Sequence, residues 1–345
     1  MIYTPSILFE NEELKILDQT LLPLKKKYIT IHNLQDGCEA IVNLRIRGAP
    51  AIGVMAALTI YIEMKRLLKE NFIKDVSDFL KNLEISLEKI GNTRPTAYNL
   101  FYTIKKIKNA FLDLEYKDPQ VALQQLKQVA LNLWEEDKKL CEEISQNAQS
   151  LIFDGSKILT HCNTGSLATS GKGTALGAIY TAWEQGKKIY VYNTETRPLL
   201  QGSRITSFEL SEAKIPNTLI TDSMVASLFQ NHQIDCVMVG ADRIAVNGDT
   251  ANKIGTFSIA IIAKYFNIPF FVLAPSSTID VSLKSGDEIL IEQRKDIEVK
   301  QFLDCISTVE NVNVYNPAFD VTPANLITAI ITEKGIFRYP YNFLR

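Results

Sequence analysis

The 345-residue chain has few cysteines and no excess of either charge, and both absences exclude classes of protein. Its five cysteines are odd in number and show no Cys-x-x-Cys spacing, which argues against a disulfide framework or a zinc cluster and favours a reducing compartment. The 37 basic and 39 acidic side chains give a formal charge of −2 at pH 7. Because no long basic tract is present, we expect no nucleic-acid partner.

The sequence also has no long apolar run. Its longest apolar stretch, residues 49–62, is shorter than the ~20 residues that a membrane-spanning helix needs. The first residues, MIYTPSILFENEELK, lack the basic-then-apolar order of a signal peptide. We therefore expect a cytoplasmic protein without a membrane partner.

The pattern of apolar residues changes once along the chain. Up to about residue 149 they recur at helical spacing, and from about residue 157 short apolar runs alternate with helical segments such as 168–186 and 251–267. The runs predict strands buried on both faces, at 157–161, 187–193, 217–222, 235–242 and 269–276. We therefore expect an α/β protein with a doubly wound, Rossmann-like C-terminal domain and a smaller, mostly helical N-terminal domain. The expected domains are a substrate-capping domain at 1–125 and a catalytic domain at 126–345.

Chemically active side chains follow the predicted strands, where open α/β sheets bind their ligands. Cys162 follows the first strand, and the residues after it, Asn-Thr-Gly-Ser, predict a turn and a helix N-terminus. Such a helix end attracts anions and lowers the pKa of a thiol, so we expect Cys162 to be functional and the other four cysteines to be structural. Asp242 follows the fourth strand, and for it a functional role and a structural role, helix capping or pairing with Arg243, stay equally open.

Three loop-to-helix junctions carry basic or amide side chains that suit a phosphate. Arg47 could bind a phosphate through its guanidinium group while Gly48 lets the backbone approach the ligand. Arg94 stands just before a predicted helix, and Asn252 and Lys253 occupy the third junction. Each junction alone is weak evidence, and together they favour one phosphate site.

Seven motifs, spread in order along residues 45–323, resemble the methylthioribose-1-phosphate isomerase family, and the resemblance covers nearly the whole chain. They are, in chain order, RIRGAPAIGV, TRPTAYNLF, HCNTGSLATSGKGTALG, NTETRPLLQGSRITSFEL, LITDSMVA, GADRIAVNGDTANKIGT and NPAFDVTP. This family lies within a wider one that includes the α, β and δ regulatory subunits of the eukaryotic initiation-factor exchange complex. The resemblance implies a homodimeric aldose–ketose isomerase, an intramolecular oxidoreductase without metal or organic cofactor. Its reaction would convert 5-methylthioribose 1-phosphate to 5-methylthioribulose 1-phosphate in methionine salvage.

The resemblance also implies a site. Its catalytic pair would be Cys162 and Asp242, and its substrate-binding residues would be Arg47, Gly48, Ala49, Arg94, Gln201, Asn252 and Lys253. The phosphate on the anomeric oxygen of a sugar 1-phosphate blocks spontaneous ring opening, so the ring oxygen has to be protonated. Asp242 would be that acid, and Cys162 would carry the proton from carbon 2 to carbon 1 or stabilise the charge there. A hydride shift stays open as the competing mechanism.

Two further alternatives stay open. Lys172, Tyr98 and Phe208 depart from the pattern expected of the family, so the substrate could also be 5-deoxyribose 1-phosphate or ribose 1,5-bisphosphate. A function of another class is a non-catalytic regulator that senses a nucleotide or sugar phosphate, like the exchange-complex subunits. Such a regulator would keep the fold but need neither Cys162 nor Asp242.

Overall fold

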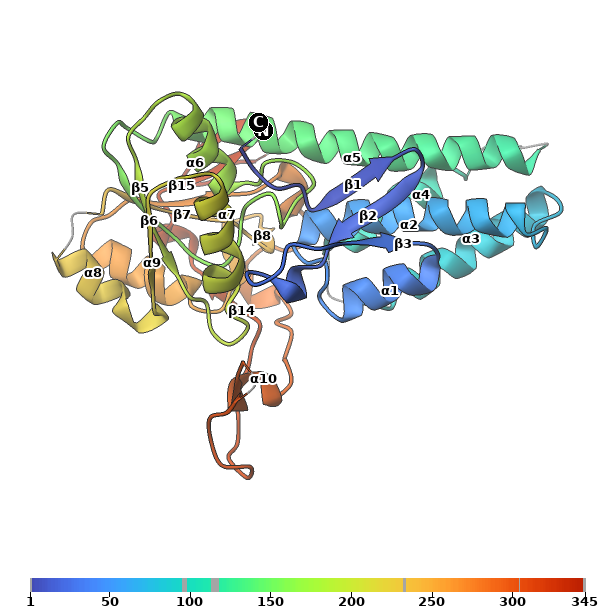
Figure 1. The fold of residues 1–345 in the computed structure, drawn as a ribbon. Coiled ribbons are helices and arrows are strands. Elements are labelled where there is room, and N and C mark those ends of the chain that lie inside the picture. The colour runs from blue at the N-terminus through green and yellow to red at the C-terminus, as the bar shows by residue number, and fades with distance from the viewer. Residues whose placement is uncertain (1, 95–97, 113–117, 232–233, 304, 344–345) are drawn as a thin grey trace. The chain divides into compact units, whose positions relative to one another are not determined.

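The computed structural model describes residues 2–94, 98–112, 118–231, 234–303 and 305–343. The polypeptide forms two compact units (Figure 1). The helical unit comprises Thr4–Leu140 and Ser166–Lys172, and the sheet unit comprises Met1–Tyr3, Cys141–Gly165 and Gly173–Arg345. The chain passes from the first to the second within α5 (Pro119–Gln149), the helix that also contains the expected domain boundary after residue 125.

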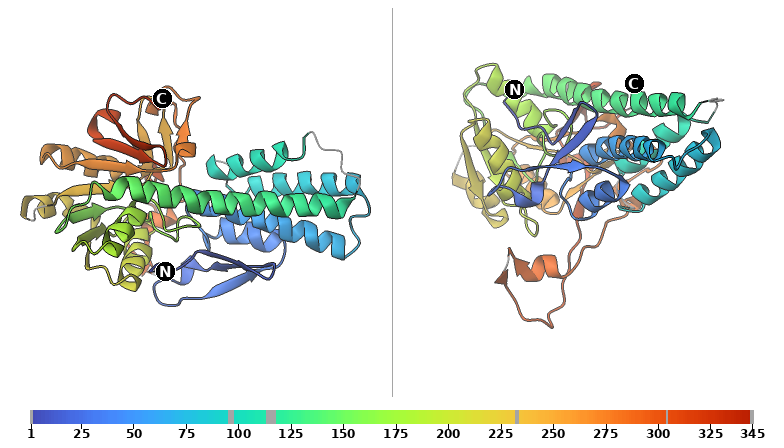
Figure 2. Two further views of the ribbon diagram at one scale, coloured as in Figure 1. Left: turned by 90° about the horizontal axis from the view of Figure 1, so that it is seen from above. Right: turned by 45° about the vertical axis from the view of Figure 1, so that its right-hand side comes forward.

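The helical unit is built around α2 (Ala49–Lys69), in which every residue from Ala51 to Met64 is buried. The longest apolar stretch of the sequence is therefore a core helix. Pro50 in its first turn has no N–H group to leave unsatisfied there. Neighbouring helices run alongside α2, and an antiparallel sheet completes the unit (Figure 2). These elements are β1 (Ile7–Glu10), β2 (Glu13–Leu17), β3 (Tyr28–Ile31), α1 (Leu34–Val42), α3 (Val76–Gly91), α4 (Tyr98–Asn109) and the first part of α5.

The sheet unit contains a seven-stranded sheet in the order β16-β15-β10-β7-β4-β5-β6, in which only β16 is antiparallel to its neighbour. The five predicted strands correspond to β4 (Lys157–Thr160), β5 (Tyr190–Thr194), β6 (Asn217–Ile220), β7 (Cys236–Val239) and β10 (Phe270–Leu273). The apolar pattern of the sequence does not predict the other two strands, β15 (Ala329–Thr332) and β16 (Gly335–Arg338).

Alternate residues of the strands enter two separate cores, because successive side chains of a strand point to opposite faces. In β7, Cys236 and Met238 pack with α6 (Ala175–Glu184) and the end of α5, whereas Val237 and Val239 pack with α8 (Val225–Asn231) and α9 (Thr256–Tyr265). Both faces of the sheet are thus covered, which explains why its strands are apolar at consecutive positions. Within the described ranges, no helix combines the length and apolarity needed to cross a bilayer.

Two predicted helices are shorter than expected. The segment 168–186 becomes helical only at the start of α6, after an irregular stretch. The segment 251–267 is helical only in α9, because its first residues belong to β9 (Thr250–Lys253), which pairs with two other strands of a small second sheet. That sheet has the order β11-β8-β9-β14 and contains β8 (Arg243–Ala245), β11 (Ile279–Asp280) and β14 (Phe319–Thr322).

A projecting segment separates β11 from β14 in the chain (Figures 1 and 2). It carries α10 (Ile297–Lys300), β12 (Gln301–Phe302) and β13 (Cys305–Ile306).

Candidate active site

Cys162 and Asp242 follow neighbouring strands at the point where the strand order of the large sheet reverses. From β4 the chain continues outward through β5 and β6 on one side, and from β7 through β10 and β15 on the other. Open α/β sheets bind ligands beyond the strand ends at such a point. The two segments are in contact, since a Cβ added to Gly240 would lie 2.9 Å from Cγ2 of Thr164.

The backbone of Cys162 is left-handed, with φ 62°, and the residue is only 9% exposed. For a non-glycine residue this conformation costs about 1–2 kcal/mol and persists only where the surroundings hold it. Its N–H donates to Oγ1 of Thr196 at 2.9 Å, and its carbonyl oxygen accepts from Oγ1 of Thr206 at 2.5 Å. Hydroxyl groups therefore bind both backbone polar groups of the residue that carries the thiol.

The helix N-terminus predicted directly after Cys162 is wrong. The chain stays irregular as far as Thr174, and α6 begins only at the next residue. Thr164 closes the start of that helix, because its carbonyl oxygen accepts from Thr174 N at 2.8 Å and its hydroxyl from Leu176 N at 3.2 Å. The expected effect of a helix end on the thiol therefore has no basis at this position.

His161 joins three segments of the sheet unit. Its Nδ1 accepts from Oγ1 of Thr194 at 2.6 Å, and its Nε2 donates to the carbonyl oxygen of Ile254 at 2.9 Å. Burial lowers the pKa of His161, which favours the neutral ring with one donor and one acceptor nitrogen. Since Ile254 follows Lys253, the ring holds the end of β9 beside the segment that carries Cys162.

Asp242 is also held against β9. Its N–H donates to the carbonyl oxygen of Ala251 at 2.9 Å, so the two candidate residues that follow Ala251 lie next to the Asp242 segment. Arg243, considered above as a partner of Asp242, has its Nη1 3.6 Å from Oδ2 of Asp280.

Asn252 and Lys253 occupy the end of β9 and not the expected loop-to-helix junction. Asn252 is buried and donates from Nδ2 to Oγ1 of Thr256 at 3.0 Å. Nζ of Lys253 donates to the carbonyl oxygen of Ala318 at 2.8 Å. The start of α9 thus positions the side chain of Asn252, and the residue just before β14 positions that of Lys253.

Asp320 of β14 binds the start of α9. Its carboxylate accepts from Gly255 N at 2.8 Å and from Phe257 N at 3.1 Å. Burial raises the pKa of Asp320 to about 6, although both N–H groups and nearby Lys253 favour the charged form. A titrating carboxyl group therefore lies beside the two candidate binding residues of β9.

Gln201 follows β5 and precedes a single π-helical turn, Gly202–Thr206, which continues as α7 (Ser207–Glu212). Such turns occur frequently at functional sites. Gln201 is 5% exposed, and its Oε1 has no hydrogen-bond partner among the described residues. Because an unsatisfied buried acceptor costs about 1–3 kcal/mol, this oxygen would gain from a ligand hydroxyl group.

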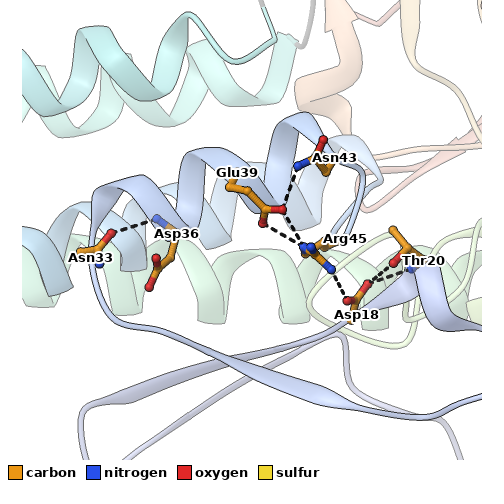
Figure 3. A network of polar contacts seen from close by, with 7 residues as sticks. All are labelled: Asp18, Thr20, Asn33, Asp36, Glu39, Asn43 and Arg45. Carbon is orange, nitrogen blue, oxygen red and sulfur yellow. Dashed lines mark hydrogen bonds and ion pairs between the residues drawn. The ribbon is translucent and has the colours of Figure 1, made fainter.

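In the helical unit, Arg45 fixes the backbone that leads to Arg47 (Figure 3). Its Nε donates to Oε2 of Glu39 at 2.8 Å and its Nη1 to Oδ2 of Asp18, which is almost completely buried, at 2.6 Å. The hydrogen bond from Arg45 lowers the pKa of Glu39 despite partial burial. Arg45 therefore has a structural role, and half-buried Arg47 is the candidate ligand of the two arginines.

Gly48 and Ala49 form the start of α2. Gly48 has φ 89°, and a Cβ there would lie 2.3 Å from the carbonyl oxygen of Ala168. The close backbone approach that glycine permits here is therefore to the segment Ser166–Lys172 of the same unit. Ala49 is the first helical residue, where the N–H groups and the dipole of a long helix favour an anion.

Arg94 lies between α3 and α4, and residues 95–97 of its motif lie outside the described residues. The helices α2 and α4 approach closely near their starts, since a Cβ on Gly53 would lie 3.0 Å from the carbonyl oxygen of Asn99. Arg94 and the start of α2 therefore lie toward the same end of this helix pair.

Hydrogen bonds within the sheet unit thus link the segment of Cys162 to the end of β9, with Asn252 and Lys253, and link β9 to Asp242. Gln201 belongs to the segment after β5 whose Thr196 and Thr206 bind the backbone of Cys162. In the described part of the chain, no three His, Cys, Asp or Glu side chains are grouped so as to hold a metal ion. A thiol, a carboxyl group, two amides and an ammonium group suit acid–base chemistry on a hydroxylated anion.

Four residues with contacts in the site have no role that the sequence predicts: His161, Thr196, Thr206 and Asp320. Their partners lie far away in the chain, so no local pattern reveals them. The only signal is their place inside the motifs.

The chain is also similar to known proteins over almost its whole length. A model of the initiation factor 2 subunit family matches residues 45–339. A relative from Caldicellulosiruptor saccharolyticus named methylthioribose-1-phosphate isomerase is 48% identical over 96% of this chain and 96% of its own. A relative from Moorella thermoacetica named 5-deoxyribose 1-phosphate isomerase is 43% identical over 97% of this chain and 94% of its own.

Two solved structures share the mixed α/β fold. One, titled 5-methylthioribose 1-phosphate isomerase from Pyrococcus horikoshii, has a TM-score of 0.90 at 37% identity and covers 98% of this chain and 94% of its own. The other, titled translation initiation factor eIF-2B subunit delta from A. fulgidus, has a TM-score of 0.87 at 41% identity and covers 98% of this chain and 96% of its own. The similarity therefore extends to proteins named as enzymes and to one named as a translation factor.

Proposed function

Since the chain belongs to the initiation factor 2 subunit family, we propose that it is the aldose–ketose isomerase that converts 5-methylthioribose 1-phosphate to 5-methylthioribulose 1-phosphate in methionine salvage. The observation that carries this proposal is the 48% identity, over almost the whole of both chains, to a relative of that name. The placement of a thiol and a carboxyl group after neighbouring strands supports it, since a purely regulatory chain would need neither.

Asp242 and Cys162 each transfer a different proton of the substrate. Protonated Asp242 gives its proton to the ring oxygen as the bond from that oxygen to carbon 1 breaks, which leaves carbon 1 electron-deficient. Cys162 as thiolate takes the proton from carbon 2, and the electron pair forms the enol. Return of that proton to carbon 1, with loss of the hydroxyl proton on carbon 2 to Asp242, gives the ketose 1-phosphate and restores both groups.

The remaining candidate residues bind the substrate. Arg47, Arg94 and the start of α2 at Gly48 and Ala49 suit the phosphate, which carries the charge. Asn252 and Lys253 suit the phosphate as well, as the sequence leads us to expect, and Gln201 suits the sugar. Gln201 offers a buried acceptor for a hydroxyl group.

Isomerisation in deuterated water tests the proton route. Deuterium at carbon 1 of the ketose supports transfer through Cys162, because an exchangeable group then carries the hydrogen. A product without deuterium favours the hydride shift and removes the shuttle role from the thiol.

We further propose a doubly wound, Rossmann-like C-terminal domain, a smaller and mostly helical N-terminal domain, and a homodimer that works in the cytoplasm. The order of the parallel strands supports the Rossmann-like domain. If these strands are numbered along the chain with β4 as strand 1, their order across the sheet is 3-2-1-4-5-6, which is the Rossmann order. Sedimentation of the purified chain at several concentrations tests the dimer.

A second candidate substrate is 5-deoxyribose 1-phosphate, since a relative 43% identical to this chain bears that name. Losing the methylthio group forfeits apolar burial only, which is worth ~1–3 kcal/mol or about 10–200-fold. Values of kcat/KM for both sugars and for ribose 1,5-bisphosphate decide among them. We expect the highest kcat/KM for the methylthio sugar. A higher kcat/KM for ribose 1,5-bisphosphate would overturn the substrate assignment.

A further inference from the structure

The left-handed backbone of Cys162 depends on groups from another part of the chain. A non-glycine residue keeps such a conformation only where several contacts determine it, and strain of this kind concentrates at functional sites. Two such contacts come from the hydroxyl groups of Thr196 and Thr206, which stand 34 and 44 residues further along the chain. Both threonines are completely buried, so water does not replace their hydroxyl groups.

Each threonine is itself fixed. The N–H groups of Thr196 and Arg197 donate to the two carboxylate oxygens of Asp222 at 2.9 and 2.7 Å. Thr196 has a left-handed backbone too, with φ 64°. The left-handed backbone of Cys162 thus depends on the left-handed backbone of Thr196, which the carboxylate of Asp222 holds in place.

Thr206 ends the π-helical turn that follows Gln201. Its hydroxyl donates to the carbonyl oxygen of Cys162 and accepts from Nδ2 of Asn163, at 3.2 Å. The same amide nitrogen binds Glu209, which is buried one turn further along. The π turn and the helix α7 that continues it therefore each place one side chain directly against the segment that carries the thiol.

We propose that Thr206 and Thr196 are positioning residues that hold the thiol of Cys162 in its reacting position. This inference rests on the proposed function. Because both threonines belong to the segment after β5 that also carries Gln201, the segment that would bind the sugar also sets the position of the thiol.

Thr206→Val tests the inference, because valine keeps the shape of threonine but cannot donate to the carbonyl oxygen of Cys162. Displacing a reacting group by about 1 Å costs up to about 100-fold in rate. We expect kcat to fall about 10- to 100-fold while KM stays within about threefold, since the phosphate contacts are untouched. Thr206→Ser restores the donor and should recover most of kcat.

Thr332→Val is the matched control. Thr332 is equally buried, and its hydroxyl accepts a single backbone hydrogen bond, from Lys334 N at 3.0 Å, at the end of β15. The Thr332→Val variant shows how much kcat changes when one buried threonine hydroxyl far from the thiol is lost. Its kcat should stay near that of the wild type.

Alkylation of Cys162, followed by mass spectrometry of its peptide, gives a readout that needs no substrate. The thiol residue is nearly buried, so release of its backbone in Thr206→Val should raise the alkylation rate at least about threefold, and Thr332→Val should not. Equal kcat and equal alkylation rates in the two valine variants would overturn the inference. A wild-type chain without isomerase activity would instead refute the proposed function and leave the alkylation test standing.

Discussion

Replacing Asp320 by Asn should remove a pH-dependent part of the stability of the chain. Burial raises the pKa of Asp320 from its ordinary 3.8 to about 6, even though Gly255 and Phe257 donate to the carboxylate. Between these two values the folded chain binds more protons than the unfolded chain. The stabilising contribution of this group is therefore full below about pH 4 and is lost as the pH rises through about 6.

The size of this loss follows from the two pKa values. A difference of one in pKa corresponds to about 1.4 kcal/mol, and 6 minus 3.8 is about 2.2, which gives about 3 kcal/mol. Asparagine does not titrate, so the variant lacks this dependence. The free energy of unfolding of the wild type, relative to that of Asp320→Asn, should fall by up to about 3 kcal/mol between about pH 4 and pH 7.

Denaturant unfolding of both proteins at about pH 4.5 and 7.5 measures the effect, since the difference between them cancels the titration of shared groups. Because pH 4.5 already lies above 3.8, the loss between these two pH values should be about 2 kcal/mol of the full value of about 3 kcal/mol. Asp249→Asn is the control. Burial of Asp249 is outweighed by hydrogen bonds from Gly286, Asn247 and Ala324, which lower its pKa below 3.8. That variant should therefore show no such change over this range. The reasoning is refuted if the wild type and Asp320→Asn differ by the same amount at both pH values.

The remaining predictions concern the candidate catalytic residues and the residues at the start of α2. Asp242→Asn and Cys162→Ser should each lower kcat at least ~100-fold, because each removes a proton-transferring group, and steady-state kinetics with either value near wild type would contradict its role. Arg47→Met should raise KM, because it removes a proposed ligand of the substrate phosphate, whereas Arg45→Met should lower the free energy of unfolding by ~2–4 kcal/mol, since a buried carboxylate loses its charged partner. Kinetics and denaturation of both variants test this. A raised KM in Arg45→Met together with a lowered free energy of unfolding in Arg47→Met would mean that Arg45 binds the substrate and Arg47 is structural. Gly48→Ala should lower the free energy of unfolding by at least ~2 kcal/mol, because the φ of 89° and the facing carbonyl group of Ala168 exclude a side chain. An unchanged free energy of unfolding would show that the backbone at this position adjusts without cost.

The sequence predicts the five strands that are apolar at consecutive positions, because burial on both faces leaves that pattern. It does not predict β9, whose residues Thr-Ala-Asn-Lys carry no apolar pattern. Pairing with β8 and with β14, far away in the chain, makes this segment a strand. The predicted helix over 251–267 therefore loses its first turn to long-range pairing, which local sequence does not record.

The candidate site shows the same limit. The positions of Cys162 and Asp242 after two of the strands follow from the alternation of strands and helices, because that alternation places strand ends at one edge. That these two strands are neighbours is known only from the strand order of the sheet. The left-handed backbone of Cys162 and the hydroxyl groups that hold it depend on a π turn that no spacing rule predicts. For the same reason the sequence suggests a helix end after the thiol, where the structure has an irregular segment.

The central claim is the isomerisation itself, and nuclear magnetic resonance of the purified chain with 5-methylthioribose 1-phosphate tests it most directly. The account predicts that the carbon 1 signal of the aldose disappears as a ketose carbonyl signal at carbon 2 appears, with the phosphate still attached. The same mixture with Asp242→Asn should change at least ~100-fold more slowly. An aldose that stays unchanged in the presence of the folded wild-type chain would contradict the account.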